Sequence, residues 1–293
     1  MKYFNQTLML VIASAGILLN TSCTHTNMST PTVAALPAIQ LKTSATLNSY
    51  LSDSANYTLY YFSNDFDGKS NCTGGCLNVW PIYYAGNNLS QAKLAAGLDI
   101  ADFGTITTAT GAKQTTYKTW PLYYYAPLVN GVNVRENAGE TTGEAVGNVW
   151  YVAKPDYTIM RVNAQLIGRN GKNYKSDYTE GTGRTLYFTD NKGVTLYAFA
   201  PDSFNINKYT KPDFSNNPTW PIYETDKIVV PSTLDKTLFS STTVFGKKQL
   251  TYKGWPMYYF GADSMRRGLN QGVSVPAPGV WPVILKDMPN APR

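Results

Sequence analysis

The chain of 293 residues has few charged side chains and a single histidine. Charged residues make up 15% of it, against roughly 25% in an average globular domain. The lone histidine removes most histidine-based chemistry, and the chain has no G-x-S-x-G elbow and no phosphate-binding loop. Aromatic side chains are frequent, at 13% with 22 tyrosines, so a mainly disordered chain is excluded. The length suffices for one large or two ordinary domains with hydrophobic cores.

The N-terminus has the pattern of a secretory signal. Lys2 precedes an apolar stretch over residues 8–19 that is too short to span a membrane comfortably. A small residue then precedes Cys23, as in a bacterial lipobox, although Asn20 stands where leucine is usual. We expect residues 1–22 to be a lipoprotein signal peptide and Cys23 to carry the lipid. An ordinary signal cleaved near residue 22 is the alternative.

The segment after Cys23 predicts a flexible tether. Residues 23–39 are rich in Thr, Ser, Asn and Pro and lack apolar periodicity over most of their length. His25 lies in this segment without a scaffold around it, so we assign it no role. The expected location is the bacterial cell envelope, with the protein lipid-anchored at the periplasmic face or the cell surface.

The basic charge does not indicate a nucleic-acid partner. The net charge is +6, and loss of Lys2 with the signal leaves +5. Apart from pairs such as Lys247-Lys248 and Arg266-Arg267, the cations are scattered and form no basic stripe. A mildly basic, solvated surface explains this charge, and we expect no binding of nucleic acid.

Two cysteines remain after the predicted lipidation site. They lie in Cys72-Thr-Gly-Gly-Cys76, and the two glycines allow a tight turn in an exported, oxidising setting. We expect a structural disulfide that fixes the shape of a loop, since so short a ring contributes little through chain entropy. A redox or soft-metal pair is the alternative, although no His or Met lies nearby.

The chain repeats itself. Residues 50–65 and 187–202 share seven of sixteen positions at an offset of 137, and the sequence Trp-Pro-Ile-Tyr follows both. Residues 113–125 and 248–260 share nine of thirteen positions at an offset of 135, and a Val-Trp pair closes each copy. We therefore expect two homologous modules, over residues 40–156 and 157–293.

Each module consists of two similar halves with an aromatic strand. These four strands are expected at residues 59–62, 122–125, 196–199 and 257–260. Alternation places the second and fourth residues of each strand, all aromatic, on one face and the first residue, Leu or Met, on the other. A further strand is expected within residues 159–167, and a short helix is possible over residues 89–97. The prediction is an all-β fold of four β-meander units in two modules.

These strands carry a recurrent Y-x-[FWY]-x-x-D pattern. It occurs three times, and the fourth copy has Leu128 in place of the aspartate. The residues of the three copies are Tyr60, Phe62, Asp65, Tyr197, Phe199, Asp202, Tyr258, Phe260 and Asp263. In these motifs, the cysteine loop and the Trp-Pro and Val-Trp pairs, the chain resembles a secreted lipoprotein repeat family of unknown function. The resemblance implies an exported, membrane-anchored β-repeat protein and supplies no reaction.

The motif residues have two interpretations. In the first, the aromatic rings are core and each Asp accepts backbone N–H bonds in a turn. In the second, tyrosine hydroxyls and carboxylates line a cleft that binds a cation or a sugar. The segment Asp65-Phe-Asp67-Gly68 also resembles part of a calcium loop but lacks a closing Glu, so a simple Asp-Gly turn is favoured. Three glutamates, Glu136, Glu140 and Glu144, are expected in an exposed Gly-containing loop.

The sequence therefore favours a non-catalytic binding module over an enzyme. Its partner would be a glycan or an envelope protein, held by exposed aromatic rings around the Trp-Pro pairs. The tryptophans concerned are Trp80, Trp120, Trp220 and Trp255. A purely structural envelope component is the alternative, and an unfamiliar enzyme with paired carboxylates is a further one. No cofactor is indicated. Solvent exposure of the four tryptophans separates the first two hypotheses.

Overall fold

The computed structural model describes residues 37–293. The signal peptide, Cys23, His25 and the tether up to residue 36 lie outside the described residues. The first strand, β1, begins at Ile39, the last residue assigned to the tether, because the Ile39 side chain is fully buried. No helix within residues 37–293 is both long and apolar enough to cross a bilayer.

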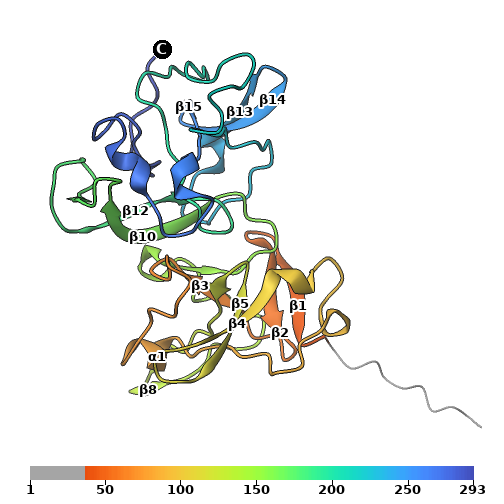
Figure 1. Ribbon diagram of the computed structural model, residues 1–293. Helices are drawn as coiled ribbons and strands as arrows, with labels where there is room; N and C mark the ends of the chain where they lie inside the picture. The colour runs from red at the N-terminus through yellow and green to blue at the C-terminus, as the bar shows by residue number, and fades with distance from the viewer. Residues whose placement is uncertain (1–36) are drawn as a thin grey trace, which may run out of the picture. The chain divides into compact units, whose positions relative to one another are not determined.

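Short antiparallel strands build the first module (Figure 1). A hairpin joins β1 to β2, a three-stranded sheet has the order β4-β5-β6, and smaller pairs are β3-β9 and β7-β8. The elements are β1 Ile39–Ser44, β2 Asn48–Asp53, β3 Tyr60–Phe62, α1 Cys76–Val79, β4 Phe103–Thr107, β5 Lys113–Tyr117, β6 Trp120–Pro121, β7 Leu128–Val129, β8 Val132–Asn133 and β9 Trp150–Val152. Single 3-10 turns lie at Gln91–Lys93, Ile100–Asp102 and Val146–Asn148.

The second module repeats the three-stranded unit as β13-β14-β15 and the β1-β2 pair as β10-β12, to which β11 adds a third strand in the order β11-β10-β12. Its strands are β10 Met160–Ile167, β11 Asn173–Tyr174, β12 Arg184–Thr189, β13 Phe239–Val244, β14 Lys247–Tyr252 and β15 Trp255–Pro256. Single 3-10 turns lie at Lys236–Leu238, Gly261–Asp263 and Gln271–Ser274. The all-β prediction is confirmed, and β10 confirms the strand expected within residues 159–167.

The expected helix over residues 89–97 is reduced to one 3-10 turn, Gln91–Lys93. Leu94 forms a parallel bridge with Ile39, and the N–H of Ala95 bonds to the carbonyl of Ile39. The chain is therefore taken into contact with β1 before a second helical turn can form.

The aromatic strands are also shorter than expected. Only the first is a strand, β3, while the others meet their neighbours through isolated bridges. Tyr60 pairs with Tyr123, and Tyr197 pairs with Tyr258, each through two reciprocal backbone hydrogen bonds of 2.8–2.9 Å. Each pair joins the two halves of one module.

Alternation along these segments separates two cores. Tyr60 and Tyr123 belong to one buried cluster of the first module, whereas Leu59 and Leu122 belong to another. The second module repeats the arrangement, with Tyr197 and Tyr258 in one cluster and Leu196 and Met257 in a second. The predicted division of faces is confirmed, and both faces are buried.

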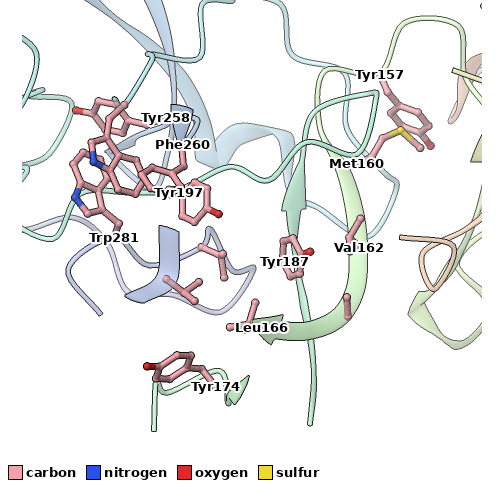
Figure 2. Packing of buried hydrophobic residues seen from close by; sticks show 14 of the residues in the cluster. Tyr157, Met160, Val162, Leu166, Tyr174, Tyr187, Tyr197, Tyr258, Phe260 and Trp281 are labelled. Atoms are coloured by element: carbon pink, nitrogen blue, oxygen red, sulfur yellow. The ribbon is translucent and has the colours of Figure 1, made fainter. Parts of the chain in front are cut away.

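One hydrophobic cluster contains residues of both modules. Tyr61, Trp120 and Tyr151 of the first module lie in the same buried cluster as Tyr197 and many other side chains of the second. Figure 2 shows the second-module part of it, with Tyr187, Tyr197, Phe260 and Trp281. Arg267 also donates hydrogen bonds to the carbonyls of Asp65 (2.8 Å) and Phe66 (3.1 Å). The modules therefore share a core.

Candidate functional site

Each motif tyrosine in the second module bonds to the motif aspartate of the opposite half. The Tyr197 hydroxyl donates to Asp263 Oδ2 at 2.6 Å, and the Tyr258 hydroxyl donates to Asp202 Oδ2 at 2.8 Å. All four side chains are fully buried. The two motif copies are thus reciprocal, since each supplies the carboxylate that satisfies the other's tyrosine.

The first module has the same two tyrosine–carboxylate hydrogen bonds, but a glutamate takes the place of one aspartate. The Tyr123 hydroxyl donates to Asp65 Oδ2 at 2.7 Å, whereas the Tyr60 hydroxyl donates to Glu136 Oε1 at 2.6 Å. Leu128, which stands at the aspartate position, begins the exposed β7–β8 hairpin. Glu136, eight residues later, therefore takes the place of the missing fourth aspartate. The expectation that Glu136 is exposed is wrong, because this hydrogen bond holds it 95% buried.

The other oxygen of each carboxylate closes the loop that follows it. Asp65 Oδ1 accepts a hydrogen bond from the backbone N–H of Asn71 at 2.7 Å. Asp202 Oδ1 accepts one from Lys208 N–H at 2.7 Å, and Asp263 Oδ1 accepts one from Gln271 N–H at 3.1 Å. Glu136 Oε2 accepts the N–H of Thr142 at 2.7 Å. Since both oxygens of every carboxylate have protein donors, the geometry fits the architectural interpretation of the motif.

Burial raises the pKa values of these carboxyl groups. Desolvation raises the pKa of Asp65 to about 8 and the pKa values of Asp202 and Asp263 to about 6, although the tyrosine and backbone donors oppose the rise. Burial also raises the pKa of Glu136. The charged form of each group is therefore disfavoured in the folded protein.

A second carboxylate pair also recurs. Asp53 Oδ2 accepts the Tyr124 hydroxyl at 2.8 Å, and Asp190 Oδ2 accepts the Tyr259 hydroxyl at 3.0 Å. Their Oδ1 atoms accept backbone N–H groups of the following turn. The repeat showed that Asp53 and Asp190 are equivalent, but not that they bind tyrosines about 70 residues away.

The four tryptophans singled out by the sequence are all buried. Their exposed fractions are 3% for Trp80, 2% for Trp120, 3% for Trp220 and 8% for Trp255. Trp80 stacks on Trp150, and Trp220 stacks on Trp281, with centroids 3.8 and 3.7 Å apart. The indole N–H groups of Trp120 and Trp255 donate to backbone carbonyls. The hypothesis that these rings stack on a ligand loses its support.

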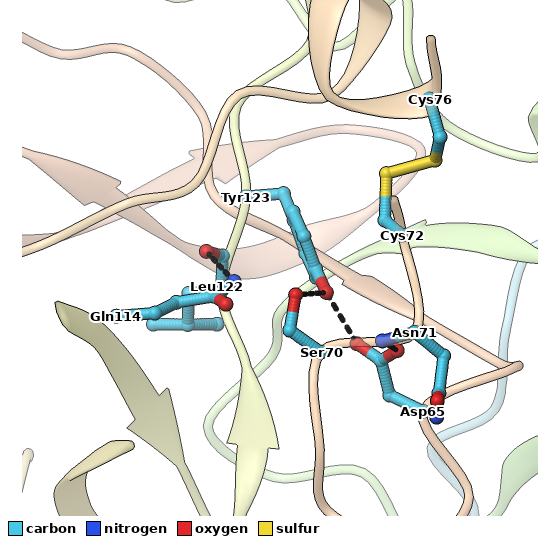
Figure 3. Close-up of a disulfide and its surroundings, with 8 residues drawn as sticks. All are labelled: Asp65, Ser70, Asn71, Cys72, Cys76, Gln114, Leu122 and Tyr123. Atoms are coloured by element: carbon cyan, nitrogen blue, oxygen red, sulfur yellow. Dashed lines mark hydrogen bonds between the residues drawn. A yellow bond between two sulfur atoms is a disulfide. The ribbon is translucent and has the colours of Figure 1, made fainter. Parts of the chain in front are cut away.

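The cysteine loop is closed as expected. Cys72 and Cys76 form a disulfide that joins the loop after Asp65 to α1 (Figure 3). In the neighbouring turn, Asp67 Oδ1 accepts hydrogen bonds from Lys69 N–H and from the Asn71 amide. Residues 37–293 contain no group of three or more His, Cys, Asp or Glu side chains that could hold a metal ion.

The role of Glu136 can be measured with a double-mutant cycle of Tyr60→Phe and Glu136→Ala. We expect a coupling of about 1.5–3 kcal/mol in the free energy of unfolding, because each single variant leaves a buried polar partner unsatisfied. Urea denaturation measures it. Glu140→Ala is the matched control in the same loop, since Glu140 is exposed and its carboxylate accepts hydrogen bonds only from the neighbouring Asn137, and it should change stability much less than Glu136→Ala. Equal effects of the two glutamate variants would contradict this role.

Comparison with protein families returned one match. The model of a secreted repeat of unknown function matches residues 48–83 and 240–284. The first segment contains Tyr60 and Asp65, and the second contains Tyr258, Asp263 and Trp281. No curated protein and no solved structure matches the chain. The family model therefore matches one segment in each module, which confirms the family resemblance that the sequence indicates.

Proposed function

We propose that this protein is an exported lipoprotein, anchored through Cys23, whose folded part is a non-catalytic binding module of the bacterial cell envelope. The observation that carries this proposal is the set of reciprocal hydrogen bonds, in which a tyrosine hydroxyl from each half of a module donates to a buried carboxylate of the other half. It commits all four of the buried carboxylates in the motif network to internal partners. In this proposal the motif residues form a rigid scaffold, and the surface around that scaffold binds the ligand.

The match to a secreted repeat supports export, and the lipobox pattern before Cys23 supports the anchor. The non-catalytic role is supported by the environment of the carboxylates. Asp65, Asp202 and Asp263 are fully buried, so they cannot reach a substrate while the fold is intact.

A purely structural envelope component is the second candidate. The burial of Trp80, Trp120, Trp220 and Trp255 favours it, because these rings then act as core. The two candidates differ in whether the folded part binds a ligand, which a direct binding experiment decides.

The anchor is tested by partitioning of the exported, full-length protein between detergent and aqueous phases. We expect the native protein in the detergent phase and Cys23→Ser in the aqueous phase, because a lipid chain supplies about 0.8 kcal/mol per buried CH₂ group. Cys72→Ser is the matched control, since it makes the same cysteine-to-serine change outside the lipobox pattern, although it breaks the disulfide with Cys76, and it should remain in the detergent phase. Aqueous partitioning of the native protein would refute the anchor.

A further inference from the structure

A cavity of about 310 Å³ opens beside the disulfide of the first module. One wall is the loop after Asp65, a second includes α1 and the segment that follows it, and a third is the tip of the β4–β5 hairpin. Its lining includes Ser70, Thr73, Leu77, Ile82, Thr108 and Thr110. We refer to this space as the hairpin cavity. Its volume lies at the lower end of the range for small-molecule sites.

The second module has a cavity of about 250 Å³ at the corresponding place. With the repeat offsets of 137 and 135, Ser70 corresponds to Asn207, and Thr108 and Thr110 correspond to Thr243 and Phe245. All of these residues line their respective cavities. Because both modules place a cavity between the same loop and the same hairpin tip, the cavity is a feature of the repeated fold.

The lining of both cavities is uncharged. None of the residues that line either of them, all within the described chain, is Asp, Glu, Lys or Arg. The hairpin cavity presents the hydroxyls of Ser70, Thr73, Thr108 and Thr110 together with aliphatic groups such as Leu77 and Ile82. An ionic ligand would lose its hydration without a counter-charge, and a wholly apolar one would leave the hydroxyls unmatched. An uncharged ligand that carries both hydroxyls and C–H faces suits this lining.

Ser70 ends a hydrogen-bond chain that begins at a motif carboxylate. The Ser70 hydroxyl lies 2.9 Å from the Tyr123 oxygen, and either atom can be the donor, while the Tyr123 oxygen lies 2.7 Å from Asp65 Oδ2 (Figure 3). The Ser70 oxygen keeps its acceptor capacity. The cavity thus includes an oriented acceptor whose position is fixed by the motif.

The two modules differ beside this position. In the second module, the Asn207 amide donates to Gln249 Oε1 at 2.8 Å. Gln114 corresponds to Gln249, but its fully buried Oε1 has no hydrogen-bond partner within residues 37–293, because Ser70 replaces the asparagine. At Ser70, which lines its cavity, the first module therefore lacks an internal contact that the second module makes through Asn207.

We infer that the hairpin cavity is a binding site for an uncharged sugar unit of a glycan, with Ser70 accepting a sugar hydroxyl, and that the second-module cavity is its counterpart. The inference rests on the proposed binding function and names its site and ligand class. Two sites on one chain would allow simultaneous contact with one glycan chain, which increases apparent affinity without new contacts.

The experiment uses the full-length chain with labelled isoleucine methyl groups. Ile82 reports on the hairpin cavity and Ile206 on its counterpart, and Ile100, which lines neither, is the internal reference. The probes are the uncharged disaccharides cellobiose and N,N′-diacetylchitobiose, the anion glucuronate, and hexanol. We expect the disaccharides to shift the Ile82 and Ile206 signals in a saturable way, and glucuronate and hexanol to shift neither.

Two variants locate the site. Ala109→Trp fills the hairpin cavity and should abolish the Ile82 response while leaving that of Ile206, which also shows that the variant is folded. Thr105→Trp on the same hairpin is the matched control, because Thr105 is exposed and does not line the cavity. Ser70→Ala should weaken binding at Ile82 by about 2- to 10-fold, as expected for one neutral hydrogen bond.

The outcomes separate this inference from the proposed function. A response of Ile82 to hexanol but not to the disaccharides would overturn the sugar class while supporting a binding role. Saturable binding of a disaccharide without a shift of Ile82 or Ile206 would overturn the site and retain the function. The absence of any response would overturn the inference and favour the purely structural candidate.

Discussion

The free energy of unfolding should fall as the pH rises from about 4 to about 8, and Asp65 should contribute most of the fall above pH 6. Its pKa is raised from 3.8 to about 8 by burial, whereas those of Asp202 and Asp263 are raised to about 6. Between its unfolded and folded pKa values, each group binds a proton in the folded state and not in the unfolded state. Stability therefore decreases with pH, by about 1.4 kcal/mol per unit for each fully shifted group.

Asp65→Asn isolates this contribution. Asparagine keeps an oxygen for one donor, and its amide can donate to Tyr123, whose proton can then turn to Ser70. We expect the stability of Asp65→Asn relative to the native protein to increase between pH 5 and pH 8, by about 3 kcal/mol in order of magnitude. Urea denaturation at several pH values measures this difference.

Asp67→Asn is the matched control for the pH series. Asp67 lies two residues further along the same turn and is exposed, so the same chemical change should leave the pH dependence nearly unaltered. A native protein whose stability rises between pH 6 and pH 8, with Asp65→Asn following in parallel, would show that Asp65 is ionised in the folded state at neutral pH.

Periodicity and repetition made the architecture predictable. The offsets of 137 and 135 identified the equivalent positions, and alternation along residues 59–62 placed Tyr60 and Leu59 in different cores, as the structure has them. The short loop of Cys72 and Cys76 likewise favoured a local disulfide over a redox or metal pair, and the structure has the disulfide. These features depend on residues close in sequence or on internal identity.

The partners of the motif carboxylates could not be predicted, because they depend on long-range contacts. Tyr60 and Glu136 are 76 residues apart, and the motif position opposite Tyr60 holds Leu128. The β7–β8 hairpin separates that position from the residue that replaces its aspartate. A search for a displaced acidic residue downstream of Leu128 would have found Glu136, but also Glu140, which is exposed, and Glu144, which is partly buried and accepts the N–H of Val152; only the folded structure shows that Glu136 reaches Tyr60.

The tryptophans show a different limit. Composition cannot tell a stacking platform on the surface from a stacked pair in a core, because both use the same apolar ring. The group on which each tryptophan ring stacks distinguishes the two cases. Trp80 and Trp220 each face a second tryptophan, the one in the closing Val-Trp pair of the same module.

Trp281→Ala should destabilise the protein by about 3–5 kcal/mol, a large part of the 5–15 kcal/mol typical of a folded domain. Trp281 is 2% exposed, stacks on Trp220 and Phe199, and meets the edges of Tyr209 and Tyr258. Its removal leaves a cavity among these rings, one of which, Tyr258, is held in place by its backbone bridge to Tyr197. Urea denaturation followed by far-ultraviolet circular dichroism measures the loss.

Trp150→Ala is the matched variant in the first module, where Trp150 stacks on Trp80 and Phe62 at 3.8 and 3.9 Å. Equivalent roles predict equivalent losses, and Trp281→Phe should recover part of the loss because a smaller ring still packs on Trp220. Since one buried cluster contains Tyr61 of the first module and Trp281 of the second, each variant should still unfold in a single transition. A loss below about 1 kcal/mol in either alanine variant would mean that the closing tryptophan is dispensable for the core.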